Sequence, residues 1–205
     1  MTNRILSTVK PLALSIFAVA LFTLAQGVAR ADNITYSTSG SFNGGPNSIT
    51  FGGGGNTLTL TFTGIAPSTV NANPSTFASF GTINTSTLGS GATITSGTTL
   101  TINITQTSPT SGTGSVVGSL TGTITQDSSS GQILFTVTST TINGITYSVV
   151  NNPLALVPPS TNNGNTTVQG QITAPVPEPA TLLLLGTGLT GVAARLRRRR
   201  KAAGK

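Results

Sequence analysis

Apolar and polar residues alternate with a period of two along most of the middle of this 205-residue chain. Over residues 57–63, for example, Leu58, Leu60 and Phe62 alternate with four threonines. This pattern is typical of strands with one buried and one wetter face, and β-branched threonine suits the wetter face. The alternation predicts strands over residues 34–41, 48–51, 57–63, 99–105, 116–126, 132–142, 145–150 and 167–173.

Turn residues separate these predicted strands. Asn143 and Gly144 are a two-residue hairpin signal of type I′, and the serine-rich segment 127–131 predicts a longer turn, so residues 116–150 are expected to form an antiparallel meander. Loops rich in Gly, Pro or Asn are predicted at 43–46, 52–55, 66–74 and 151–165. Helical periodicity is absent from this part of the sequence. We therefore predict an all-β domain over residues 32–173, an antiparallel β-sandwich of about eight strands.

The N-terminal 31 residues have the layout of a secretory signal peptide. A positive segment with Arg4 and Lys10 precedes an apolar stretch over residues 12–25. Ala29 and Ala31 then supply a small-x-small cleavage site, which predicts a mature chain that begins at Asp32. This layout predicts that a secretion translocase exports the chain and that a signal peptidase cleaves it.

Residues 174–205 form a tail with a short motif, an apolar span and a basic end. Pro177 and Pro179 restrict the backbone around Glu178 to extended geometry. The apolar residues that follow, 182–194, predict a transmembrane helix whose basic end stays in the cytoplasm. The basic stop consists of Arg195, Arg197, Arg198, Arg199, Arg200 and Lys201.

On these features, residues 176–201 resemble the PEP-CTERM sorting signal of exported bacterial proteins. The same tail is sometimes labelled an ice-binding protein C-terminal domain. The resemblance implies that Pro177, Glu178 and Pro179 are recognised by an exosortase, a membrane-embedded cysteine transpeptidase that removes the tail near the motif. It also implies a Gram-negative host that makes extracellular polysaccharide, and a mature protein at the cell surface or in the extracellular matrix. It carries no information about the β domain.

The positive charges behind the formal net charge of +7 all lie at the two ends of the chain. All the Lys and Arg residues lie before residue 31 or after residue 194. In residues 32–176 the only charged residues are Asp32 and Asp127. A domain without cations cannot neutralise phosphates, which excludes nucleic-acid binding by the mature chain. Its low charge favours association with itself or with a matrix.

Groups that carry enzyme chemistry are scarce in the predicted domain. The whole chain lacks His and Cys, and the domain lacks Lys, so a nucleophilic serine has no base and zinc has no ligands. A glycosidase pair would have to be Asp32 and Asp127, one at the predicted mature start and one in a serine-rich turn. The glycine run at 52–55 lacks the Lys of a phosphate-binding loop. We therefore expect no enzymatic activity and no cofactor.

Three binding functions are compatible with these features. The leading hypothesis is a structural or adhesive protein of the cell surface or extracellular polysaccharide. The alternative is a carbohydrate-binding module with a defined glycan site that uses Tyr36 or Tyr147, because sugar sites usually include exposed aromatic rings. A less favoured hypothesis is ice binding by an outward-facing row of threonines. That row would consist of Thr57, Thr59, Thr61 and Thr63.

Overall fold

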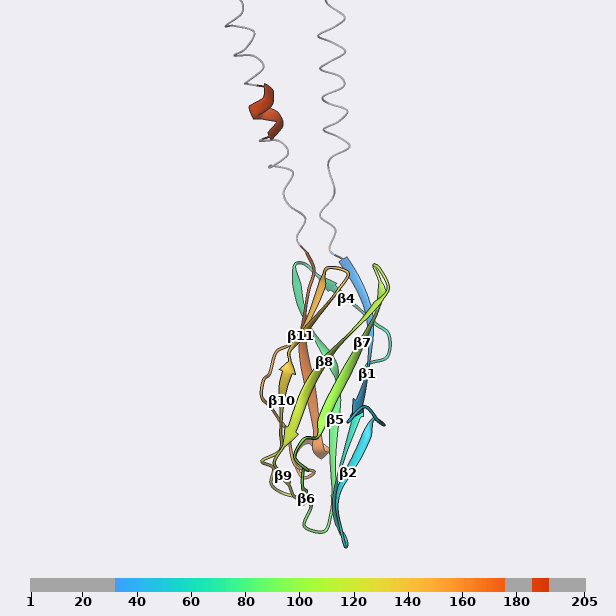
Figure 1. The fold of residues 1–205 in the computed structure, drawn as a ribbon, viewed down its shortest axis with the longest axis vertical. Coiled ribbons are helices and arrows are strands. Elements are labelled where there is room, and N and C mark those ends of the chain that lie inside the picture. The colour runs from blue at the N-terminus through green and yellow to red at the C-terminus, as the bar shows by residue number, and fades with distance from the viewer. Residues whose placement is uncertain (1–31, 176–185, 192–205) are drawn as a thin grey trace, which may run out of the picture. The chain divides into compact units, whose positions relative to one another are not determined.

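The computed structural model describes residues 32–175 and 186–191. Residues Ala31–Pro175 cluster into one compact unit, and Figure 1 shows its strands. The described strands are β1 (Asp32–Phe42), β2 (Ser48–Gly53), β3 (Asn56–Thr63), β4 (Ser68–Ala72), β5 (Ser75–Leu88), β6 (Ala92–Thr93), β7 (Thr99–Ser108), β8 (Gly112–Thr121), β9 (Thr123–Ile124), β10 (Gln132–Val137), β11 (Ser139–Ile142), β12 (Ile145–Val149), β13 (Leu154–Ala155) and β14 (Asn165–Thr173). A 3₁₀ turn, η1 (Asn162–Gly164), precedes β14.

Two six-stranded sheets make up most of this unit. The first has the order β13-β10-β8-β7-β1-β4, and the second has the order β11-β12-β14-β5-β3-β2. A two-stranded piece, β6-β9, accompanies them. All strand pairings among the described residues are antiparallel. The prediction of an all-β antiparallel fold is therefore confirmed.

The buried residues of the two sheets form a single apolar core. In β3, the alternation is as predicted, with Leu58, Leu60 and Phe62 buried and the threonines between them half-buried. Strand β7 buries Leu100, Ile102 and Ile104 in the same way. Because one face of each strand is apolar and the other carries hydroxyls, the two sheets pack through their apolar faces.

An aromatic cluster within the core joins the two sheets. The rings of Tyr36 in the first sheet and of Phe80 and Tyr147 in the second lie with centroids 6.0 to 6.3 Å apart. Their edge and tilted arrangements are those that aromatic quadrupoles favour. The Tyr147 hydroxyl lies 2.8 Å from Gln106 Oε1 in the first sheet and donates a hydrogen bond to it. Both apolar contacts and a hydrogen bond therefore fix the alignment of the two sheets.

The number of strands and the meander were predicted wrongly. The described residues form fourteen strands rather than about eight. The segment 132–142 is not one strand but two, because β10 pairs with β8 in the first sheet while β11 pairs with β12 in the second. A register shift between Phe135 and Val137 marks the corner at which the chain changes sheets. The predicted hairpin is confirmed, since Asn143 and Gly144 join β11 to β12 with φ values of 49° and 85°.

The longest strand, β5, is absent from the predicted set. It lies between β14 and β3 at the centre of the second sheet. A bulge interrupts its alternation, because Val168 pairs with Gly81 while the next residue, Gln169, pairs with Ser79. The extra residue, Phe80, turns into the core and is fully buried. The inward positions therefore change parity halfway along the strand, which hides the period of two.

Both ends of the domain lie beside the β4–β5 turn. Asp32, the first residue of β1, pairs with Ala72, and Thr173, the last residue of β14, pairs with Ser75. The Ala174 backbone N–H then donates to the Pro74 carbonyl at 2.8 Å. The β2–β3 hairpin lies at the other end, since Gly53 pairs with Asn56 there. With 14 residues in β5, the two ends are about 45 Å apart at ~3.3 Å per residue.

Candidate functional site

Most of the predicted targeting residues lie outside the described residues. These are Ala29 and Ala31 of the leader, the motif Pro177, Glu178 and Pro179, and the stop residues Arg195, Arg197, Arg198, Arg199, Arg200 and Lys201. Asp32 begins strand β1. Of the predicted transmembrane helix, residues 186–191 are described, and they are helical. No helix within the described ranges is both long and apolar enough to cross a membrane. Signal peptide and transmembrane helix therefore stay predictions.

The two tyrosines do not form an exposed sugar site, so that prediction is wrong. Tyr36 is 2% exposed and Tyr147 is fully buried. Their hydroxyls bond inside the domain, Tyr36 to the Ser79 carbonyl and Tyr147 to Gln106. Burial raises the pKa of both phenols, and the proximity of Tyr36 raises the pKa of Tyr147 further. Each tyrosine is amphipathic, so an alternating strand pattern does not distinguish a buried ring from an exposed one.

The threonine row of β3 lies on the outer face of the second sheet. Its neighbours already engage part of it, because Thr50 and Thr59 form a hydroxyl–hydroxyl bond of 2.9 Å and Ser48 and Thr61 one of 3.1 Å. On the other side, Ser86 faces Thr59 and Asn84 faces Thr61. The threonine row is therefore not repeated on the adjacent part of the sheet, as an extended ice-binding face requires.

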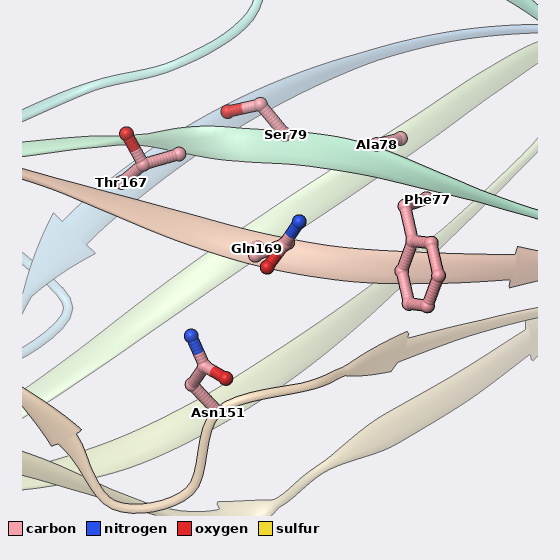
Figure 2. A pocket seen from close by; sticks show the side chains of 6 residues that line it. All are labelled: Phe77, Ala78, Ser79, Asn151, Thr167 and Gln169. Carbon is pink, nitrogen blue, oxygen red and sulfur yellow. The ribbon is translucent and has the colours of Figure 1, made fainter.

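A hollow of about 480 Å³ opens on the same sheet, over β5 and β14. Figure 2 shows its six lining residues, with the ring of Phe77 at one end and the side chains of Gln169 and Asn151 beyond it. The lining residues are Phe77, Ala78, Ser79, Asn151, Thr167 and Gln169. None of these residues is charged. The Phe77 side chain is 62% exposed, whereas Phe42, Phe51, Phe62, Phe80 and Phe135 are at most 5% exposed.

The β5 bulge and the path of the chain after β12 create this hollow. The bulge places Ser79 opposite Gln169 and sends Phe80 inward beneath Gly170. On the other side of β14, the pairing with β12 ends at Val149, and one further backbone bond runs from the Val150 N–H to the Gln169 carbonyl at 3.0 Å. The chain then leaves toward β13 in the first sheet. Asn151 therefore faces the open flank of β14.

Several polar groups in the hollow are available to a ligand. Ser79 is engaged, because its hydroxyl accepts from the Gly81 N–H at 3.2 Å. The side chains of Gln169, Asn151 and Thr167, in contrast, make no hydrogen bond to any other residue in the described ranges. Two amides and one hydroxyl thus offer donors and acceptors next to an exposed aromatic ring. This combination can bind a ligand that is both hydroxylated and partly apolar.

The sequence contains a signal for Phe77 that the strand prediction did not use. Phe77 and Phe80 are three positions apart, so in a regular strand they point to opposite faces. At least one of the two rings must therefore leave the core side or be accommodated by a bulge. The structure shows both effects, since Phe77 is exposed and Phe80 lies at the bulge.

The described residues offer little chemistry for metal binding or catalysis. Asp127 is exposed in the turn between β9 and β10, in which the Thr125 N–H donates to the Ser128 carbonyl at 2.8 Å. No group of three or more His, Cys, Asp or Glu residues occurs within the described part of the chain. The glycine run ends β2 and forms the hairpin to β3, as predicted for a turn.

A protein-family model for the PEP-CTERM protein-sorting motif matches residues 175–199. The match confirms the resemblance of the tail, and the motif implies an exported, membrane-anchored precursor that an exosortase processes. The comparisons with curated proteins and with solved structures gave no match. The family match covers only the tail, so the function of the β domain has to be inferred from the structure of that domain.

Proposed function

We propose that this chain is a non-enzymatic protein of the cell surface that has a structural or adhesive role in extracellular polysaccharide. The observation that carries the proposal is the PEP-CTERM sorting motif at residues 175–199, joined to a domain almost without reactive groups. The expected partners are a secretion translocase, a signal peptidase, an exosortase and the polysaccharide itself. The host is expected to be a Gram-negative bacterium.

The surface chemistry of the domain supports a matrix role. Its outer faces carry Thr, Ser, Asn and Gln, and residues 33–175 contain one charged side chain, Asp127. Such a surface exchanges hydrogen bonds with sugar hydroxyls, whereas it has no basic groups for binding polyanions by charge. Attachment to polysaccharide is therefore expected to resist salt.

The arrangement of the ends of the domain is also suited to display. The chain enters at Asp32 and leaves at Pro175 beside the same β4–β5 turn. A tether through the residues after Pro175 therefore holds the domain by this end. The side faces and the β2–β3 hairpin then stay accessible to the matrix.

Fractionation of the native host tests the proposal. Wild-type protein is expected in the extracellular polysaccharide and should remain there through a high-salt wash. The Glu178→Ala variant is expected to stay in the membrane, because the recognition motif is broken. Thr173→Ala serves as a matched control, since Thr173 is exposed and lies just before the matched segment 175–199. Wild-type protein that the salt wash releases, or that never leaves the membrane, would contradict the proposal.

A further inference from the structure

The structure assigns a binding site for an uncharged saccharide chain to the hollow on the outer face of the second sheet, between Phe77 and Asn151. The inference rests on the proposed matrix role and gives it a specific ligand class. The hollow lies on the β5–β14 pair at the centre of the sheet, so rigid strands hold most of its groups.

Phe77 supplies the apolar contact that such a ligand needs. A pyranose ring has one or two faces of C–H groups, and these faces pack on an aromatic ring while the hydroxyls stay in water or bond to the protein. Phe77 has 62% of its surface exposed, and four of the other five residues that line the hollow are polar. Keeping a phenylalanine there has no benefit for the core, because the ring does not belong to the buried cluster.

The polar groups beyond Phe77 match the rest of a saccharide. In Figure 2 the amide of Gln169 lies between the ring of Phe77 and the side chain of Thr167, and the amide of Asn151 lies on the flank. Each amide offers donors and an acceptor, which suits sugar hydroxyls that both donate and accept. A volume of about 480 Å³ is within the range of small-molecule sites. The open form of the hollow admits the middle of a chain as well as its end.

Charge decides between saccharide classes. No Lys or Arg occurs in residues 32–175, so the carboxylates of an acidic polysaccharide find no counter-ion at the site. A protein partner is disfavoured for a different reason, because one exposed ring among amides and hydroxyls is far smaller than the apolar core of a typical protein interface. An uncharged saccharide fits both observations.

Titration calorimetry of the full chain tests the inference, in a detergent without a sugar head group. The probes are oligosaccharides cut from the host's extracellular polysaccharide and separated by anion exchange into neutral and acidic fractions. Four proteins are compared: wild type, Phe77→Ala, Gln169→Ala and Leu88→Ala. Leu88 is the matched control because it is also 62% exposed and lies on β5, about 36 Å from Phe77 at ~3.3 Å per residue.

The wild type is expected to bind the neutral fraction saturably and equally well at low and high salt. Phe77→Ala should bind about tenfold more weakly, given the size of aromatic stacking energies. Gln169→Ala should also weaken binding, and Leu88→Ala should leave it unchanged. Far-UV circular dichroism establishes that each variant is folded. Phe77→Tyr keeps the aromatic ring and should retain binding, so it separates loss of the ring from any loss of stability in Phe77→Ala.

Three results would overturn the inference: no saturable binding of the neutral fraction, equal binding by Phe77→Ala, or preference for the acidic fraction. Self-association of the wild type that Phe77→Ala abolishes, seen by sedimentation, would also overturn it in favour of a protein interface. The assay does not depend on processing of the tail. Failure here together with normal fractionation therefore rejects the site and not the matrix role.

Discussion

Removal of one hydroxyl from the core, by Tyr147→Phe, is predicted to destabilise the domain strongly. Tyr147 and Gln106 are both fully buried, and the hydroxyl donates to Gln106 Oε1 at 2.8 Å. Gln106 Nε2 donates at 2.7 Å to the Thr110 carbonyl, so only its oxygen loses a partner in the variant. The phenylalanine ring keeps its packing against Tyr36 and Phe80.

The expected cost is that of a buried acceptor left without a donor, about 2 kcal/mol. In a domain of this size, that corresponds to a fall in melting temperature of about 6 °C. Thermal and urea unfolding, followed by far-UV circular dichroism, measure both quantities. Tyr36→Phe is the matched comparison, because its hydroxyl donates to the backbone carbonyl of Ser79 instead of a side chain.

A second substitution tests the cause of the loss. When Gln106→Leu is added to Tyr147→Phe, the Gln106 oxygen is no longer present to be left unpaired, and the Thr110 carbonyl still accepts from Asn143 Nδ2 at 3.4 Å. The double variant should therefore be more stable than Tyr147→Phe. An unchanged melting temperature for Tyr147→Phe would refute the reasoning, and so would a double variant whose losses simply add.

Two further predictions concern packing and pH. A Cβ at position 170 would overlap the Phe80 ring, so Gly170→Ala should lower the free energy of unfolding, measured in urea, by about 1–3 kcal/mol. Gly53 has open space around it, so Gly53→Ala should be neutral or slightly stabilising. Equal effects of the two substitutions would contradict the packing of Phe80 beneath β14. The raised pKa values of Tyr36 and Tyr147 mean that the folded state holds both phenol protons more tightly than the unfolded chain. The free energy of unfolding should therefore stay constant up to about pH 10 and fall above it, and the fall should be smaller in Tyr147→Phe. A fall that Tyr147→Phe leaves unchanged would contradict the assignment of this pH dependence to Tyr147.

The sequence predicts the local structure of this domain better than its topology. Leu58, Leu60 and Phe62 alternate with threonines and form a strand as expected, and Asn143 with Gly144 forms the expected hairpin. The corner at Val137 was not predictable, because residues 138–141 are Thr and Ser, which suit a strand equally well whether the chain stays in one sheet or changes sheets. The pattern within one strand carries no information about the sheet that the strand joins.

The candidate site was missed for a related reason. Its central strand, β5, has a bulge at Phe80 that shifts the parity of the inward positions, so neither the strand nor the outward direction of Phe77 follows from a period of two. Tyr36 and Tyr147 were favoured for sugar binding by residue type alone. Their burial depends on the facing sheet, which supplies Gln106 and completes the aromatic cluster.

The central proposal is that the chain is exported, cut at both ends and delivered to the cell surface or the extracellular matrix. Intact-mass analysis of the protein from the extracellular fraction of its host, beside Glu178→Ala, tests it most directly. The account predicts a wild-type chain that begins near Asp32 and ends within residues 177–180, and a variant that keeps its whole tail in the membrane. A wild-type mass that still includes Arg195 to Lys205 would contradict the account and identify the tail as a permanent anchor.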